Sequence, residues 1–374
     1  MTARVLHAAV IGGGMIAAVH RRAILASGGV VAGVLGSSPE RAAAVAAQWD
    51  TTSFVDLDAL LAANIDVVHV CSPNATHLEY ALAAVDAGLH VVCEKPLATT
   101  VADAALLAGA AANAGVVATV PFVYRYHPLI SELRARRMQG RFGRWNALHG
   151  SYLQDWMLAP SAGNWRVDSA AGGASRAFAD IGTHWCDLVE FVSGERIAEV
   201  SATTSVAVAE RPATSTQSFS GDGGYGPTEA VTTEDIAIAT FLTEAGVPGN
   251  VVVSQVAAGR RNRLWFELDG ADGSAVFDQE NPESAWLGHP DGATLLARGA
   301  GELSDAQKRL SFLPGGHPQG YQDAFSAFVA DTYEGIRTGR LPDGLPTFED
   351  GARAARIVDA VLGSALSRAW APVR

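Results

Sequence analysis

The sequence predicts an α/β protein whose first third folds as a doubly wound parallel sheet. Apolar strand-like runs alternate there with helical segments of about 10–15 residues. A glycine-rich turn joins the first run to the first helix, and 374 residues are enough for about two domains. We therefore expect a first domain at residues 1–123 and a second α/β domain at 124–374.

The elements of the first domain follow from apolar periodicity and from turn residues. A strand near residue 10 precedes a helix, Pro39 opens a second helix, and Gly88 closes a third. The expected later strands are "GVVAGVLG" (29–36), "IDVVHVCSP" (65–73), "LHVVCE" (89–94) and "VVATVPF" (116–122). The expected helices between them are 39–49, 75–88 and 100–115. Such alternation favours right-handed crossovers and helices on both faces of the sheet.

Composition narrows the class of protein. The net charge of -12 argues against non-specific binding to nucleic acid, which needs clustered Lys and Arg. No apolar run is long enough to span a membrane, and the N-terminus lacks a signal-peptide layout. The three cysteines, Cys71, Cys93 and Cys186, are widely spaced. We therefore expect a reduced cytoplasmic protein with no disulfide, no metal site and no membrane or nucleic-acid partner.

The turn after the first strand fits a dinucleotide-binding pattern. Gly12, Gly14 and Ala17 match G-x-G-x-x-G/A between a strand and a helix. Glycine permits close backbone approach, and the N–H groups at Met15 and Ile16 would face a pyrophosphate. The alternative is a flavodoxin-like or P-loop sheet without a nicotinamide, and the sequence contains no G-x-x-x-x-G-K-[ST] motif.

The choice between NAD and NADP stays open. A NAD site normally carries an acid about 20 residues after the glycines, where it binds the ribose 2′-hydroxyl. Here Ser37 and Ser38 stand at that strand end, and Arg41 follows one turn later. Arg41 could pair with a 2′-phosphate, or it could simply solvate its helix.

Polar residues follow two further strands at their carboxyl ends, where ligands bind in such sheets. Lys95 is a candidate base or polarising group, because desolvation or nearby charge can bring a lysine pKa toward neutrality. Glu94 would hold the adjacent loop or the ribose, although a surface Lys–Glu pair is the more ordinary outcome. The remaining expected cofactor contacts at these ends are Ser72, Pro73, Asn74, His77 and Arg125.

A second group of polar residues lies in "GGASRAFADIGTHWCDLVEFVSG", which begins at Gly172. A helix is expected from Asp180, with an apolar stripe on one face and Asp180, His184 and Asp187 along another edge. A carboxylate four residues from a histidine can orient the imidazole, so His184 is a candidate acid–base group. The alternative is a solvated helix face that happens to be polar.

Residues that could bind a substrate combine flat aromatic rings with hydrogen-bonding groups, as carbohydrate rings require. The stretch "HGSYLQDWMLAP" is expected to be a strand with Tyr152, Gln154 and Trp156 on one face. The expected substrate contacts are Lys95, Tyr124, Gln154, Trp165, Arg166, Asp180, His184 and His317, with the last in a loop before a helix starting near Tyr321. The alternative is that the tryptophans are core and Arg166 is an ion-pair partner.

Three motifs together resemble the Gfo/Idh/MocA oxidoreductase family. They are G-x-G-x-x-A, "CEKPLA" and "GG…DIGTHWCDL", and the resemblance covers essentially the whole chain. It implies a Rossmann domain joined to an α/β domain with a large, mostly antiparallel open sheet that commonly forms oligomer contacts. A homodimer or homotetramer is therefore expected. The resemblance also implies that Lys95, Asp180 and His184 are catalytic and that Gly12, Gly14 and Ala17 form the cofactor turn.

The second-domain residues resemble the sugar-oxidising, glycoside 3-dehydrogenase branch of that family. This implies a NAD(P)-dependent enzyme that acts on CH–OH donors and oxidises a secondary ring hydroxyl to a ketone. The alternatives are another reductase of the family, of imine, bilin or dihydrodiol type, and a non-catalytic NAD(P)-binding sensor. Residues 210–235, rich in Ser, Thr, Gly and Pro, are expected to form a loop or partly disordered insertion.

Overall fold

The computed structural model describes residues 4–212 and 227–374 and divides into two compact units. The first unit runs to Val123 and also includes Tyr321–Ala355, and the second comprises Tyr124–Gly320 and Arg356–Arg374. The sequence analysis assigned all of 124–374 to one domain, whereas residues 321–355 pack with the first unit. Among the described residues, no helix is both long and apolar enough to cross a membrane.

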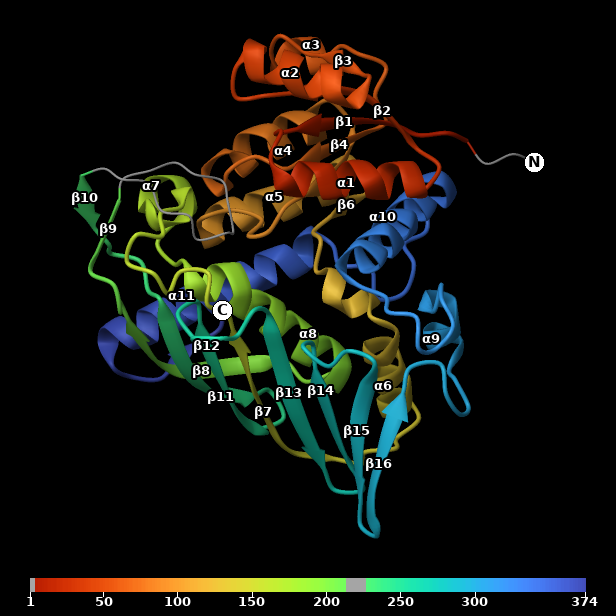
Figure 1. Cartoon of the computed structure of the whole chain (residues 1–374), viewed down its shortest axis with the longest axis vertical. Coiled ribbons are helices and arrows are strands. Elements are labelled where there is room, and N and C mark those ends of the chain that lie inside the picture. Colours follow the sequence, from red (N-terminus) through yellow and green to blue (C-terminus); the bar gives the residue numbers. More distant parts are fainter. Residues whose placement is uncertain (1–3, 213–226) are drawn as a thin grey trace. The chain divides into compact units, whose positions relative to one another are not determined.

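The first unit is built on a six-stranded sheet in which every pairing is parallel (Figure 1). The strand order is β3-β2-β1-β4-β5-β6, so the doubly wound prediction is confirmed. The strands are β1 (His7–Ile11), β2 (Val30–Leu35), β3 (Thr52–Ser53), β4 (Val67–Val70), β5 (His90–Cys93) and β6 (Ala118–Thr119). The carboxyl ends of β1, β4 and β5 therefore lie next to one another at one edge of the sheet.

Helices connect these strands and cover the sheet. They are α1 (Met15–Ala26), α2 (Pro39–Trp49), α3 (Leu57–Leu61), α4 (His77–Asp86) and α5 (Val101–Ala114), joined by α10 (Tyr321–Thr338) and the start of α11 (Phe348–Ser367). Side-chain caps begin three of them: Ser38 accepts from the Arg41 N–H, Asp56 from the Ala59 N–H, and Thr100 from the Asp103 N–H. Helix α10 packs against α1, which explains why this late segment belongs to the first unit.

Two differences from the expected elements occur in the first unit. The last strand is only two residues long, and the short elements β3 and α3 were not predicted. Strand β3 consists of Thr52 and Ser53, which are polar and exposed, so no apolar period marks it. Its pairing to β2 comes from tertiary contact rather than from its own sequence.

The second unit contains a nine-stranded sheet of order β16-β15-β14-β13-β7-β12-β11-β8-β17 (Figure 1). All neighbouring pairs are antiparallel except β7 with β12, so the prediction of a large, mostly antiparallel sheet is confirmed. The strands are β7 (Trp145–Leu153), β8 (Ile197–Ser205), β11 (Ile236–Thr243), β12 (Pro248–Ser254), β13 (Arg263–Gly270), β14 (Ser274–Asp278), β15 (Ser284–His289), β16 (Gly292–Ala297) and β17 (Ala371–Pro372).

Helices cover one face of this sheet and complete its core. They are α6 (Pro128–Met138), α8 (Thr183–Ser193) and the later turns of α11, and a π-helix (Phe178–Gly182) leads directly into α8. The unit also contains the short helices α7 (Ser169–Gly172) and α9 (Asp305–Leu310), and α9 packs against α6. Helix α8 packs on the central strands, where the Trp185 indole N–H donates to the Trp265 carbonyl over 2.9 Å. Trp185 is fully buried among apolar residues of the sheet.

Three expected boundaries in the second unit need correction. The helix predicted from Asp180 begins at Phe178 with a π-helical turn. The strand predicted through Trp156 ends at Leu153: Gln154 still donates its N–H to Ser254, and the chain then turns between Asp155 and Leu158. The expected loop at 210–235 contains two short paired strands, β9 (Glu210–Pro212) and β10 (Thr228–Ala230), and its centre lies outside the described residues.

Phe241 tests the core of the second unit. Its ring is 1% exposed and packs against Trp185 with ring centroids 6.0 Å apart. We expect Phe241→Ala to lower the free energy of unfolding by about 3–5 kcal/mol, because the small side chain leaves a cavity. Leu366→Ala is the control, since Leu366 is 89% exposed on α11 and its truncation should cost less than about 1 kcal/mol. Urea denaturation measures both, and equal losses would contradict this description of the core.

Candidate active site

The turn between β1 and α1 leaves no room for a side chain at Gly12. Its φ is +113°, and a Cβ there would lie 2.6 Å from the Cys71 carbonyl oxygen. Gly14 is the N-cap of α1 and supplies no capping side chain, so the first N–H groups of the helix, at Met15 and Ile16, have no side-chain acceptor at the cap. The close approach of Gly12 to the Cys71 backbone and the N–H groups without a side-chain cap together fit a pyrophosphate group at this helix start.

The end of β2 carries hydroxyls and a guanidinium. Ser38 caps α2 by accepting the Arg41 N–H over 3.3 Å, and the Arg41 guanidinium donates to the Ser37 hydroxyl, also over 3.3 Å. Arg41 is therefore directed back toward the strand end rather than outward along its helix. No carboxylate occupies residues 36–38, so the structure leaves the choice between NAD and NADP as open as the sequence did.

His77 joins the loops that follow β4 and β5. Its Nδ1 lies 2.8 Å from the Pro96 carbonyl oxygen, and its Nε2 lies 2.9 Å from the Ser72 carbonyl oxygen. The ring is fully buried, and burial lowers the pKa of His77 although both carbonyls oppose that shift. His77 was predicted to contact the cofactor, and what the structure shows is a histidine that holds together the loops carrying Ser72 and Lys95.

Glu94 and Lys95 follow β5 directly. Glu94 is 6% exposed, and its Oε2 accepts the backbone N–H of Lys95 over 3.1 Å. Burial alone would raise the pKa of the Glu94 carboxyl, but its hydrogen bond with His20, together with the nearby Lys95, lowers that pKa below its ordinary value. The Lys95–Pro96 peptide is cis, and Lys95 itself is half-buried. An ionised carboxylate thus lies beside the candidate base.

Cysteines flank this part of the sheet. Cys71 and Cys93 are buried, and burial raises the pKa of both thiols well above their ordinary value. Both therefore remain protonated thiols, and Cys186 in the second unit is also buried.

Asp180 occupies the π-helical turn in the second unit. Its Oδ2 accepts from the Gln255 amide over 2.8 Å, and its Oδ1 lies 3.5 Å from the Nε of Arg166. The Arg166 guanidinium in turn stacks over the Trp165 ring at 4.5 Å. Three predicted substrate residues, Trp165, Arg166 and Asp180, therefore come together, and Arg166 is the ion-pair partner that the sequence analysis kept as an alternative.

His184 follows Asp180 by one helical turn and is 6% exposed. Its ring meets Tyr124 edge to face, with centroids 5.0 Å apart. The Tyr124 hydroxyl lies 2.8 Å from that of Tyr152 on β7. His184, the candidate acid–base residue, thus contacts Tyr124, which was also predicted to bind the substrate.

A network centred on Asn262 continues from these tyrosines. The Asn262 side-chain oxygen accepts from Tyr152 over 2.7 Å and from the Gln154 amide over 2.8 Å. Gln154 accepts in turn from the Trp156 indole over 2.8 Å. The Asn262 network (Tyr124, Tyr152, Gln154, Trp156 and Asn262) thus supplies aromatic surface and hydrogen-bonding groups next to His184.

Asp187 forms an ion pair with Arg125. Arg125 donates to it from Nε over 2.8 Å and from Nη2 in a second, shorter bond. The three polar residues predicted along one helix edge therefore have different partners, and the π-helical turn interrupts the regular spacing between Asp180 and His184. The cofactor contact predicted for Arg125 remains a prediction.

His317 belongs to a different loop from the Asn262 network. It is exposed, and its carbonyl oxygen and the Gln319 side chain are both bound by Arg298. The predicted start of the following helix at Tyr321 matches α10. The substrate contact predicted for His317 remains a prediction.

Comparison with known proteins identifies the family. Residues 6–122 match the model of the oxidoreductase family with a NAD-binding Rossmann fold, and residues 130–276 match the GFO/IDH/MocA C-terminal domain. The chain belongs to the Gfo/Idh/MocA family. This Gfo/Idh/MocA protein is therefore a member of an oxidoreductase family, and its first unit carries the NAD-binding Rossmann fold of that family.

The relatives of this Gfo/Idh/MocA protein include sugar dehydrogenases. Levoglucosan dehydrogenase of Pseudarthrobacter phenanthrenivorans is 31% identical over 83% of this chain and 80% of its own length. UDP-N-acetylglucosamine 3-dehydrogenase of Acidithiobacillus ferrooxidans is 27% identical over 89% of this chain and 88% of its own. Among solved structures, levoglucosan dehydrogenase with NADH and L-sorbose has a TM-score of 0.90 and 29% identity, covering 99% of both chains.

The sequence analysis of this family member missed several residues that hold the candidate site. Gln255 binds Asp180, Asn262 centres the network beside His184, and His20 binds Glu94 over 3.0 Å. Gln255 did carry a signal, since it is a polar residue directly after the apolar strand "VVVS". Asn262 and His20 carried no signal in the local sequence, because their roles come from hydrogen bonds with residues far away in the chain.

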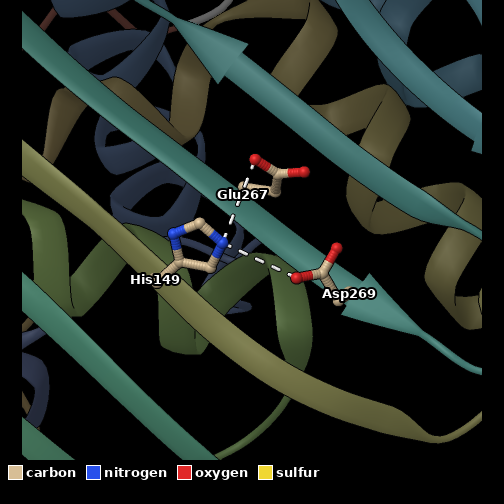
Figure 2. A group of neighbouring side chains, drawn as sticks. All are labelled: His149, Glu267 and Asp269. Carbon is tan, nitrogen blue, oxygen red and sulfur yellow. Dashed lines mark ion pairs between the residues drawn. The ribbon is translucent and has the colours of Figure 1, made fainter.

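Strands β7 and β13 carry a separate group of charged residues. His149 lies opposite Glu267 in the strand pairing, and Asp269 follows two residues later on the same face. Figure 2 shows the imidazole facing both carboxylates, with Nε2 at 3.9 Å from Glu267 and 3.6 Å from Asp269. These groups could hold a cation, and a protonated His149 would itself offset the two negative charges. Both of its ion pairs stay within these two strands.

Gly12 tests the cofactor turn. We expect Gly12→Ala to weaken NADH binding by about tenfold or more, because the added Cβ would meet the Cys71 carbonyl and alanine disfavours the required φ. Gly28→Ala is the matched control, since Gly28 also has a positive φ, of +72°, and an added Cβ would have nothing within 4 Å. Fluorescence titration with NADH measures both. An unchanged affinity for Gly12→Ala would contradict the assigned turn.

Proposed function

We propose that this protein oxidises a secondary ring hydroxyl of a sugar, anhydrosugar or cyclic polyol to a ketone. NAD or NADP, when bound, accepts the hydride from the ring carbon. The observation that carries the proposal is the contact between His184 and the Asn262 network, with Asp180, Arg166 and Trp165 one helical turn away. The names of the relatives support the same class of substrate, because several are sugar dehydrogenases and three are 3-dehydrogenases of sugar compounds.

The side chains around His184 match the chemistry of a sugar ring. Trp156 and Trp165 are half-buried, so each keeps an exposed part on which an apolar ring face could stack. Gln154 and Arg166 supply amide and guanidinium donors for hydroxyl groups. A substrate without hydroxyls, such as an imine or a bilin, would leave these polar groups unsatisfied on binding, which is costly in a partly buried site.

The proposed chemistry needs one base. As hydride leaves the ring carbon, the O–H proton of the same carbon must pass to a protein group, and the oxygen becomes the ketone oxygen. We assign Lys95 and His184 to this step: one takes the proton and the other donates a hydrogen bond to the oxygen. Asp180 stabilises the positive charge that develops. The ionised Glu94 beside Lys95 serves the same purpose in the first unit.

A substrate panel tests the proposal directly. The protein is incubated with pyranosides, anhydrosugars and cyclic polyols, with NAD and NADP in parallel, and reduced nicotinamide is followed by absorbance. We expect oxidation of at least one cyclic polyhydroxy compound, and NMR of the product should show a ring ketone. Activity confined to imines or bilins would replace this proposal with the other reductase class, and no turnover with any substrate would favour a sensor.

Substitutions of the proposed acid–base groups test their roles. We expect Lys95→Ala and His184→Ala each to lower kcat by about 10²–10⁴-fold with little change in KM, because general acid–base help acts in the transition state. Lys308→Ala and His289→Ala are matched controls, since both residues are exposed and outside the site. The roles would be wrong if kcat survived and only KM rose.

We further propose that the open face of the nine-stranded sheet forms a homodimer or homotetramer. Its outward side chains include Ile238, Trp286 and Leu295, which are 49%, 38% and 68% exposed, and Trp286 pairs directly with Leu295. We expect light scattering to show an oligomer, and Trp286→Glu with Leu295→Glu to dissociate it. Leu366→Glu is the control, because Leu366 is 89% exposed on α11. A monomeric wild-type protein would contradict this proposal.

A further inference from the structure

Four buried polar side chains in the first unit form an unbroken line of hydrogen bonds. Glu94 after β5 lies 3.0 Å from Nε2 of His20 on α1, and Nδ1 of His20 lies 2.8 Å from Nδ1 of His69 on β4. Nε2 of His69 lies 3.1 Å from the Tyr333 hydroxyl on α10. His20, His69 and Tyr333 are 0% exposed. We call this set the Glu94–Tyr333 chain.

With a neutral His20, the chemistry of these groups sets the direction of every hydrogen bond. An ionised carboxylate only accepts, so His20 must donate from Nε2. A neutral His20 then accepts at Nδ1, and His69 must donate from its own Nδ1. His69 accepts at Nε2, so the Tyr333 hydroxyl donates to it. All four groups are satisfied in this arrangement, with Glu94 as the only charge.

The protonation states required by this direction agree with burial. Burial, followed by the nearby His20, lowers the pKa of His69 well below its ordinary value, so His69 is neutral. Burial raises the pKa of Tyr333, so the tyrosine keeps its proton. The pKa of Glu94 lies below its ordinary value because its hydrogen bonds outweigh burial. His69, Tyr333 and Glu94 therefore carry the charges that this direction requires.

The chain ends at the candidate base. Oε1 of Glu94 binds His20, while Oε2 accepts the backbone N–H of Lys95 over 3.1 Å. A carboxylate held at both oxygens has little freedom to turn. The Lys95 main chain is therefore held by a carboxylate whose own position is set by α1, β4 and α10.

We propose that His20 is a positioning residue for Lys95: it holds Glu94 so that its free oxygen binds the Lys95 N–H and fixes the origin of the Lys95 side chain. This deepens the proposed function and rests on it for its effect on turnover. His20 does not itself take part in proton transfer. Loss of its Nε2 donor would leave a buried carboxylate without its main partner, and Glu94 would then take up a proton or turn away.

Three variants separate positioning from packing. His20→Ala removes the donor, whereas His20→Gln keeps a donor close to the place of Nε2. Tyr333→Phe breaks the far end of the chain and leaves the bond between His20 and Glu94 in place. We expect His20→Ala to lower kcat by about 10- to 100-fold with KM for the sugar within about twofold, as small displacements of a reacting group do. We expect His20→Gln and Tyr333→Phe to stay within about fivefold of wild type.

Two further measurements do not depend on turnover. Nitrogen-15 NMR of the histidines should show a proton on Nε2 of His20 and on Nδ1 of His69. Hydrogen exchange of the Lys95 amide should be slow in wild type and His20→Gln and at least about tenfold faster in His20→Ala. Thermal unfolding of all variants identifies any general loss of stability.

The outcomes are distinguishable. If the substrate panel finds no oxidation, the proposed function fails, and the tautomers and Lys95 exchange still decide whether His20 positions Lys95. The positioning role would be overturned by wild-type kcat and Lys95 exchange in His20→Ala, by equal losses in His20→Ala and His20→Gln, or by the opposite tautomers. Equal losses in Tyr333→Phe and His20→Ala would show general destabilisation instead.

Discussion

A buried carboxylate must find hydrogen-bond donors within the protein, and this requirement organises the first unit around Glu94. The residue stands where β5 ends, at the edge of the sheet where ligands of parallel sheets bind. One of its oxygens binds His20 and the other binds the Lys95 main chain. The same edge carries the close approach of Gly12 to Cys71 and the His77 link between two loops. The candidate base therefore follows a strand end whose neighbouring loops are joined by side-chain hydrogen bonds.

The second unit also contains buried carboxylates whose hydrogen-bond donors come from the protein. They belong to Glu234 and Asp235, directly before β11. Asp235 is 0% exposed and binds the guanidinium groups of Arg176 and Arg211, and Arg211 also donates to the carbonyl oxygens of Met157, Ala159 and Ala162. Glu234 accepts from Ser175 and from the N–H groups of Arg176 and Phe178, where the π-helical turn begins. Adjacent carboxylates thus hold both the loop after β7 and the segment that presents Asp180.

Local signals in the sequence were sufficient for the longer elements of the first unit, but they missed β3 and α3 and overestimated the length of β6. The glycine turn, the proline at the start of α2 and the alternating runs predicted the parallel sheet, because those signals act over a few residues. The positions of Asp180 and His184 also followed from local pattern. Their partners did not: Gln255, which binds Asp180 from 75 residues later, directly follows β12, and Asn262, which binds Tyr124 beside His184, directly precedes β13. The register of these strands decides which residues the two side chains contact. The π-helical turn was missed because helical periodicity assumes 3.6 residues per turn throughout.

The arrangement of strands in the second unit has a consequence for how the chain is made. Strand β7 ends at Leu153, yet its two neighbours, β12 and β13, begin only at Pro248 and Arg263. During synthesis, about a hundred further residues must therefore be added before a neighbouring strand can pair with either edge of β7. Such distant pairings slow folding, and an uncovered strand can pair with other chains. Until β12 and β13 have been synthesised, both edges of β7 are open to pairing with strands of other polypeptides. Correct folding of a nascent second unit therefore requires that such pairing be prevented.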